Sequence, residues 1–146
     1  MNPDALEAAL RALRTTDRFE TEIRQTLESK GFESKDIDQV TQHLIRRKLL
    51  DDRRTTLNLI ERKSGRRAIG IEKLRAELLS RGAPEEIVEE SLANLSWEDQ
   101  RRAMRDALSS KFKPTDNRAK AARFLLGRGF AEDEIEGALD EFFLQE

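Results

Sequence analysis

The 146-residue sequence lacks cysteine and tyrosine and contains a single histidine, His43. Without cysteine, neither a disulfide nor a thiol nucleophile can form, and one imidazole cannot build the usual His-rich or Cys-rich transition-metal site. No Gly-x-Ser-x-Gly segment indicates a nucleophilic serine. We therefore expect no catalytic residues, no metal and no cofactor, and we predict that the protein is not an enzyme.

The sequence also lacks long apolar runs and alternating apolar–polar runs. No run approaches the ~20 apolar residues of a membrane span, and no signal leader is expected, so we predict a cytoplasmic protein that does not contact membranes. No period-2 run of β-branched and aromatic residues indicates a strand. Charged residues make up 38% of the chain and aromatic residues 5%. These features predict an all-α fold.

A pattern built around a glycine is present three times. Each glycine follows a cation, and a leucine stands four residues before it. The three leucine–glycine pairs are Leu27 and Gly31, Leu78 and Gly82, and Leu125 and Gly129. Because the surrounding sequences align over roughly forty residues, we interpret the chain as one helical unit used three times.

Each repeat is predicted to contain three helices, with the glycine in a positive-φ conformation that ends the middle helix. The cations before the glycines, Lys30, Arg81 and Arg128, would then complement the negative end of the helix dipole. The expected helices are 4–14, 17–30, 34–48, 52–63, 67–81, 84–95, 97–111, 115–128 and 131–144. We predict an elongated, monomeric array of three tandem three-helix modules, with boundaries 1–50, 51–96 and 97–146.

Charge is segregated along the chain although the total is only −2. Residues 42–83 hold 12 Lys/Arg against 5 Asp/Glu, a net of +7, and residues 101–128 hold 9 against 2, again +7. The segments that follow each block, 84–100 and 129–146, contain acidic residues and no Lys or Arg. Neighbouring blocks could simply neutralise each other as solvated ion pairs, which contribute little individually.

The cations between residues 46 and 67 are denser than local neutrality requires, and we predict that they form a partner-binding surface, the basic corner. The basic corner comprises Arg46, Arg47, Lys48, Arg53, Arg54, Arg62, Lys63, Arg66 and Arg67. Arg101, Arg102 and Arg105 are expected to matter less, because acidic residues in 89–99 lie near them in sequence.

Two groups of motifs resemble the RecX family. The first is Leu49-Leu50-Asp51-Asp52, followed by Glu61-Arg62, Gly65, Gly70-Ile71, Glu77-Leu78 and Arg81-Gly82. The second is Arg123-Phe124-Leu125 with Arg128-Gly129-Phe130 and Ile135. In physical terms, Asp51 or Asp52 can cap the following helix, and Leu49 and Leu50 would pack where two modules meet. Thr55 and Thr56 depart from the family pattern, which usually has an aromatic residue and an alanine there.

The resemblance implies a slightly curved stack of three three-helix modules that regulates the recombinase RecA in DNA repair. Such a protein binds the RecA–DNA filament, meets single-stranded DNA mainly within it, and mostly inhibits the ATPase, recombinase and co-protease activities of RecA. Two other classes stay open. The chain could be a helical-repeat adaptor for an unrelated protein, or a stand-alone DNA-binding protein of the helix-turn-helix type.

Overall fold

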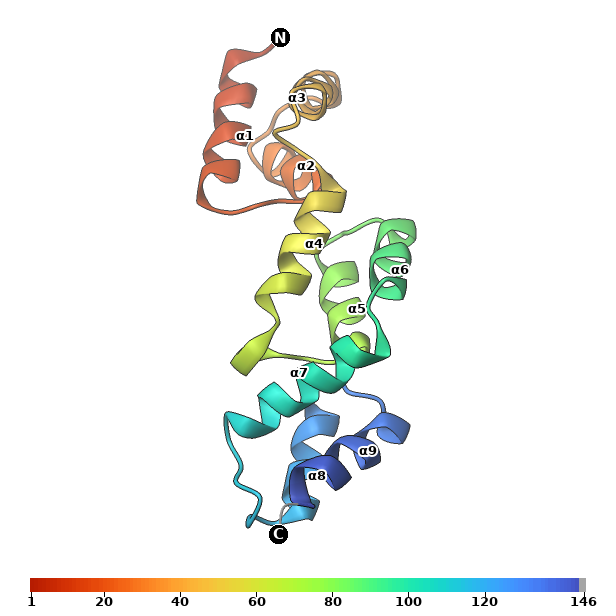
Figure 1. The fold of residues 1–146 in the computed structure, drawn as a ribbon. Helices are drawn as coiled ribbons and strands as arrows, with labels where there is room; N and C mark the ends of the chain where they lie inside the picture. The colour runs from red at the N-terminus through yellow and green to blue at the C-terminus, as the bar shows by residue number, and fades with distance from the viewer. Residues whose placement is uncertain (145–146) are drawn as a thin grey trace. The chain divides into compact units, whose positions relative to one another are not determined.

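The computed structural model describes residues 1–144, which contain nine α helices and no strand (Figure 1). The helices are α1 (Pro3–Thr15), α2 (Glu20–Ser29), α3 (Ser34–Arg46), α4 (Asp52–Arg62), α5 (Ile71–Ser80), α6 (Glu85–Ala93), α7 (Trp97–Ser109), α8 (Arg118–Gly127) and α9 (Glu132–Phe143). The all-α class is therefore confirmed. The elongated, curved shape and the three module boundaries stay predictions.

Short polar side chains fix where several helices begin, because they accept hydrogen bonds from main-chain N–H groups that have no partner within the helix. Asn2 accepts from the first turn of α1, and Asn117 accepts from Lys120 at the start of α8. Ser96 and Asp99 form a reciprocal capping box at α7, as the sequence predicts.

The middle helix of each repeat begins three or four residues later than expected. The helix predicted from residue 17 begins at Glu20, where the side chain of Glu22 accepts from the N–H of Phe19 at 2.9 Å. The helix predicted from residue 115 begins at Arg118, after a turn in which Asp116 accepts from the N–H of Lys113.

The start of α5, the middle helix of the second repeat, depends on a contact with a distant part of the chain. The helix predicted from residue 67 begins at Ile71, and Gly65–Arg67 form a separate 3-10 turn, η1. The later start of α5 is explained by a main-chain hydrogen bond. The N–H of Gly70, directly before α5, donates to the oxygen of Arg128 at 2.8 Å and not to an oxygen of a preceding helical turn.

The chain divides into two compact units. The first comprises residues 1–57 and 78–88, and its core lies among α1, α2 and α3. The second comprises residues 58–77 and the chain from residue 89 onward, and its core lies among α7, α8 and α9 (Figure 1). Each unit therefore includes a segment from the middle of the chain.

The repeated leucines share their burial, and the repeated glycines share their backbone conformation. Leu27, Leu78 and Leu125 are completely buried. The glycines that follow them have φ values of +87°, +91° and +88°, in the left-handed region that glycine enters without steric cost. The Leu–Gly spacing thus places a core residue in the last turns of each middle helix and a reversal of the chain directly after it.

Within the first unit, the corner formed by Arg81 and Gly82 packs against the start of α2. Gly82 approaches Thr21 so closely that a Cβ on the glycine would lie 2.8 Å from the Cβ of Thr21, whose hydroxyl donates to the Gly82 oxygen at 3.0 Å. Arg81 bridges to Glu22 at 2.9 Å and donates to the main-chain oxygen of Asp17 at 3.1 Å. Its guanidinium lies over the ring of the fully buried Phe19, 5.1 Å from the centroid.

The second unit repeats this contact with the corner formed by Arg128 and Gly129. A Cβ on Gly129 would lie 2.9 Å from the main-chain nitrogen of Lys73, at the start of α5. Arg128 donates to the main-chain oxygen of Ala68 at 2.8 Å. Asp17 lies three residues before the first residue of α2, and Ala68 lies three residues before the first residue of α5. One joint is therefore built twice from the same repeat positions.

These joints change the interpretation of the cations that precede the glycines. The sequence predicts that they complement helix dipoles, but Arg81 and Arg128 reach main-chain oxygens outside their own helices. Lys30, the third member of the set, is exposed. A Cβ on the adjacent Gly31 would lie within 4 Å of no described residue other than Gly31 and its two chain neighbours.

Candidate functional site

The first part of the basic corner lies where α3 ends and α4 begins. Arg46 is the exposed last residue of α3, Arg47 follows it and is also exposed, and Arg53 is exposed in the first turn of α4. Arg54 is partly buried and donates from Nη1 to the main-chain oxygen of Lys48 at 2.9 Å. Arg54 therefore helps to position the connection between the two helices, besides contributing charge.

Lys48 stands at the sharp turn of this connection. Its φ of +59° makes it the one non-glycine residue with positive φ in the described chain. A side chain in this conformation is uncommon and costs roughly 1 kcal/mol or more, and such positions cluster at functional sites. The turn leaves Leu49 outside, 47% exposed, and directs Leu50 inward, 3% exposed. Leu50 therefore packs in the core of the first unit, whereas the prediction that Leu49 packs is wrong. A junction between modules at this point stays a prediction.

The two aspartates that follow cap two different helices. Asp51 accepts from the main-chain N–H groups of Arg53 and Arg54 and so caps α4. Asp52 accepts instead from the N–H of Glu20, the first residue of α2, at 2.8 Å. Burial raises the pKa of the Asp52 carboxyl above its ordinary value, and the hydrogen bond from Glu20 offsets part of that rise. Both carboxylates therefore stabilise the starts of helices by accepting hydrogen bonds from main-chain N–H groups.

A hollow of about 300 Å³ opens beside these aspartates within the first unit. Its apolar wall comes from Ile45 of α3, Leu50 and Ile87 of α6, and Lys48 and Arg53 border it. Sequence reasoning missed this hollow, because Ile87 is 37 residues from Leu50 and no local pattern connects them. The one local signal is Ile45, an aliphatic residue directly before a run of three cations.

The second part of the basic corner belongs to the second unit. Arg62 ends α4, and Lys63 forms an ion pair with Glu77 at 3.7 Å. Arg66 and Arg67 are exposed on η1. The structure thus places most of the predicted cations at the surface and divides them between the two units.

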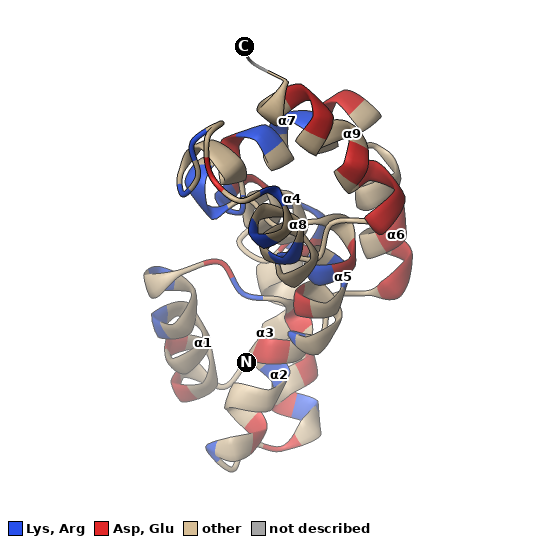
Figure 2. Ribbon diagram, turned by 90° about the horizontal axis from the view of Figure 1, so that it is seen from below, with Lys and Arg blue, Asp and Glu red and all other residues tan. Residues whose placement is uncertain are grey.

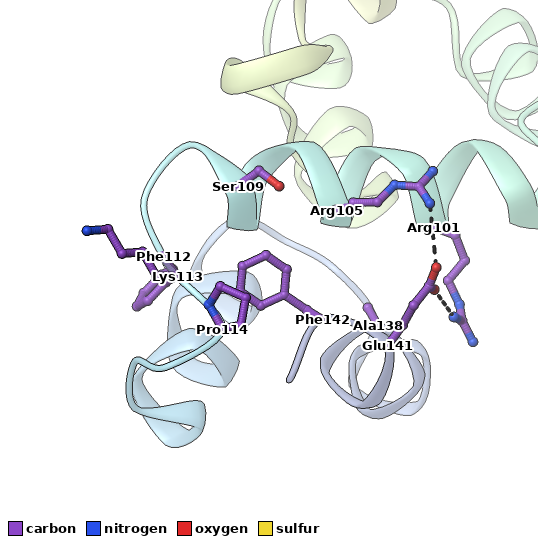
Figure 3. Close-up of a pocket in the computed structure, with 9 residues that line it drawn as sticks. All are labelled: Arg101, Arg105, Ser109, Phe112, Lys113, Pro114, Ala138, Glu141 and Phe142. Carbon is purple, nitrogen blue, oxygen red and sulfur yellow. Dashed lines mark hydrogen bonds and ion pairs between the residues drawn. The ribbon is translucent and has the colours of Figure 1, made fainter. Parts of the chain in front are cut away.

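The arginines at the start of the second basic block have a structural role instead. Arg101 pairs with Glu141 of α9 at 2.9 Å (Figure 3). Its guanidinium also lies over the ring of Trp97, 4.3 Å from the centroid. Arg105 contacts the same carboxylate at 3.5 Å. The acid that these two arginines contact lies on α9, because α9 folds back across α7. That they matter less for binding than the basic corner stays a prediction.

The acidic residues gather on the third helix of each later repeat, α6 and α9 (Figure 2). Arg75 bonds Glu89 of α6 at 2.9 Å, and Arg118 of α8 bonds Glu136 and Asp140 of α9. Local neutralisation, the simpler interpretation of the charge pattern, thus holds for these cations. No equivalent ion pair is found in the described chain for Arg46, Arg47, Arg66 or Arg67.

Residues 1–144 offer few features other than charge for binding. No group of three or more His, Cys, Asp or Glu side chains there could hold a metal ion. None of the helices described combines the length and apolar character needed to span a membrane.

Comparison with known proteins gives a consistent result. A family model described as "RecX, first three-helix domain" matches residues 5–44. A Regulatory protein RecX of Thermus thermophilus is 34% identical over 130 residues, covering 89% of this chain and 86% of that protein. The protein of the same name from Prosthecochloris aestuarii is 31% identical and covers 94% and 92%.

A solved structure shows the likeness of fold. RecX from Lactobacillus salivarius matches 97% of this chain and 96% of its own with a TM-score of 0.82, at 21% sequence identity. The RecX proteins of the three organisms thus share their fold or their sequence with this chain over most of its length.

Proposed function

Since this chain belongs to the RecX family of regulatory proteins, we propose that it binds the filament that the recombinase RecA forms on DNA. In this proposal the chain acts as a cytoplasmic monomer and mostly inhibits the ATPase, recombinase and co-protease activities of RecA. It meets single-stranded DNA mainly as part of the filament. The observation that carries the proposal is the similarity to RecX proteins over about nine-tenths of the chain.

The charge distribution supports a role for the basic corner in this binding. The total charge of −2 disfavours tight binding to bare DNA, because nonspecific affinity depends on the number of phosphates that a protein neutralises. Exposed cations at a protein contact mainly accelerate encounter and orient docking. The basic corner lies in both units, so each unit can supply its own contact, and two weak contacts on one chain reinforce each other.

The proposal is tested by the rate of RecA-catalysed ATP hydrolysis on single-stranded DNA as the chain is titrated in. We expect the rate to fall with increasing chain, and strand exchange to fall with it. A parallel anisotropy measurement on bare single-stranded DNA over a salt series separates the alternatives. Strong, steeply salt-dependent binding to bare DNA with no effect on RecA would favour a stand-alone DNA-binding protein. No response to RecA or DNA would favour an adaptor for another protein.

The contribution of the basic corner is tested by neutralising its two parts separately. Arg46→Gln with Arg47→Gln changes the first unit, and Arg66→Gln with Arg67→Gln changes the second. Each pair should raise the concentration needed for half-inhibition, more so at low salt, because screening weakens contacts between exposed charges.

The matched control pair is Arg14→Gln with Arg102→Gln, two arginines outside the basic corner. Arg101 and Arg105 are unsuitable controls, because their contacts with Glu141 connect α7 to α9. If all three pairs inhibit as the parent does, the basic corner is a solvated face and the contact lies elsewhere.

A further inference from the structure

Two hollows in the second unit share the side chain of Phe112. The first, of about 360 Å³, lies between α7 and α9 (Figure 3). The second, of about 700 Å³, lies between α8 and the segment that leads into it. Among the described residues that line either hollow, none is Leu, Ile, Val or Met. The walls are therefore made of aromatic rings, charged side chains and small or polar residues.

Cations outnumber carboxylates around these hollows, with six Lys or Arg against two acids. One acid, Glu141, contacts both Arg101 and Arg105 (Figure 3). The other, Asp116, accepts from the main-chain N–H of Lys113 at 2.7 Å. The remaining cations of the lining are all exposed and form no ion pair in the described chain, and they are Lys111, Lys113, Lys120 and Arg123. The charge of this surface therefore selects an anion.

The start of α8 lacks the contact that covers the other two middle helices. Gly82 packs against the start of α2, and Gly129 packs against the start of α5. No glycine corner of the described chain packs against the start of α8, where Asn117 and Lys120 are exposed. The cations that border the second hollow are therefore accessible to a partner.

The residue types around the hollows favour a nucleic-acid strand over an acidic segment of protein. Lysine is depleted from the cores of protein interfaces, whereas Lys and Arg beside aromatic rings are typical of grooves that bind single strands. Three of the four cations without an ion pair are lysines. Lys120 and Arg123 stand three residues apart on α8, so their side chains leave the same face of the helix. Neighbouring cations of this kind suit the repeated phosphates of a strand.

The two aromatic rings of the second hollow have different surroundings. Lys111 and Arg128 lie over the ring of Phe124, at 4.9 Å and 4.7 Å from its centroid. Phe112 packs against Phe124 in a T-shaped arrangement, with the centroids 5.4 Å apart. Phe112 is only partly buried and lines both hollows, so it is the ring that can receive an unpaired base.

We propose that this surface, the α8 track, binds a short stretch of single-stranded DNA. The α8 track comprises Lys111, Phe112, Lys113, Lys120 and Arg123. Its cations bind phosphates, and an unpaired base stacks on Phe112. The proposal rests on the proposed function for the choice of DNA, since the filament holds such a strand, and it separates the DNA contact from the basic corner. Because the total charge is −2, the binding is weak and is measured at low salt.

The test follows the anisotropy of a labelled oligo(dT) as the full chain is titrated in over a salt series. Lys120→Gln with Arg123→Gln removes two cations of the α8 track. The matched control is Arg14→Gln with Lys30→Gln, which also removes one Arg and one Lys that are exposed, but in the first unit.

The stacking step has its own pair of variants. Phe112→Leu removes the ring and keeps an apolar side chain, whereas Phe112→Tyr keeps a ring. The thermal transition of every variant is recorded. The two cation variants change only exposed residues, so they decide the proposal even if Phe112→Leu does not fold.

We expect the Lys120 and Arg123 pair to raise Kd for oligo(dT) roughly fivefold at low salt and to lower the salt slope by about 1.4, since each phosphate contact on a single strand contributes about 0.7 to the slope. The control pair should leave the slope unchanged. Phe112→Leu should raise Kd roughly tenfold at every salt concentration, because stacking on an aromatic ring does not depend on ionic contacts. Phe112→Tyr should bind as the parent does.

Three results overturn the proposal. The first is a parent chain that does not bind oligo(dT) at low salt, and the second is equal losses for the two cation pairs, which would make binding a matter of total charge. The third comes from the RecA ATPase assay on the same preparations. If the Lys120 and Arg123 pair loses inhibition but binds oligo(dT) as the parent does, the α8 track contacts protein. A parent that binds oligo(dT) in the expected pattern but leaves RecA unaffected overturns the proposed function alone.

Discussion

The hydroxyl of Thr21 donates to the main-chain oxygen of Gly82, 61 residues away, at 3.0 Å. The contact requires a residue without a side chain at position 82, because a Cβ there would lie 2.8 Å from the Cβ of Thr21. Gly129 meets the first turn of α5 in the same way. Two distant parts of the chain are thus joined through a glycine at each of these corners.

Replacing these glycines by alanine should separate the effect of φ from the effect of contact. Gly31→Ala meets only the cost of a side chain at positive φ, roughly 1 kcal/mol. Gly82→Ala and Gly129→Ala add a steric clash and should lose about 2–4 kcal/mol in total. Urea unfolding measures all three free energies. Equal losses for the three variants would contradict the joint.

Leu78→Ala should lower the free energy of unfolding by roughly 2–5 kcal/mol, because Leu78 is completely buried at the end of a middle helix. Leu79→Ala is the control, since its side chain is 42% exposed one residue further along α5. Denaturant unfolding of both variants provides the comparison. A loss below about half a kcal/mol for Leu78→Ala would show that the repeat position is not part of a packed core.

Arg81→Ala should destabilise the protein by about 1.5–3 kcal/mol, because it removes charge-assisted hydrogen bonds to Glu22 and Asp17 and the stacking on Phe19. Arg81→Lys should recover only part of this loss, since an ammonium cannot reproduce the planar fork of the guanidinium. Lys30→Ala, at the equivalent exposed position, should change stability by less than about 0.5 kcal/mol. Thermal unfolding of the three variants provides the measurement.

Asp52→Asn should have an effect that depends on pH. Because burial raises the pKa of Asp52 in the folded protein, the parent binds more protons folded than unfolded, and this group's contribution to stability falls as pH rises through that pKa. The amide keeps an oxygen that can accept from Glu20 and carries no charge to bury. The stability of the variant relative to the parent should therefore be greater near pH 7 than near pH 4. A difference that is constant or reversed between these pH values would contradict the shift.

Lys48→Gly should stabilise the protein by roughly 0.5–1 kcal/mol, because glycine adopts φ +59° without strain. The same variant should inhibit RecA less well than the parent if the basic corner, of which Lys48 is a part, contributes to binding. Urea unfolding and the ATPase assay on one preparation provide the two measurements. A variant that gains no stability would show that the turn is unstrained.

Much of the fold could be predicted because its signals are local. The ends of α2, α5 and α8 follow from the glycines, and the start of α7 follows from Ser96 and Asp99. These are contacts within a few residues, which sequence spacing records directly. The sequence predicts the start of α5 too early, because that start depends on Gly70 bonding Arg128, a contact that no local pattern contains.

The candidate site was less predictable, because charge density in sequence does not reveal partners in space. The exposed positions of Arg46 and Arg66 agree with the predicted surface, whereas Arg54 also donates a hydrogen bond to the main-chain oxygen of Lys48. Arg101 finds its acid forty residues away on α9. The hollow at Ile45 depends on Ile87, which only folding brings near. A surface made by distant segments has to be read from the structure.

The joint made by Arg81 and Gly82 with the start of α2 has a consequence for how such a chain can arise. Helix α5 takes part in both joints. Its first turn packs against Gly129, and its last turn directly precedes Gly82, which packs against the start of α2. A duplicated copy of the segment around this helix would bring along a receiving turn and a corner that already fit each other. Gene duplication of this segment would therefore lengthen such a chain without a new interface, and later divergence would act on exposed residues such as Ile45 and Lys48.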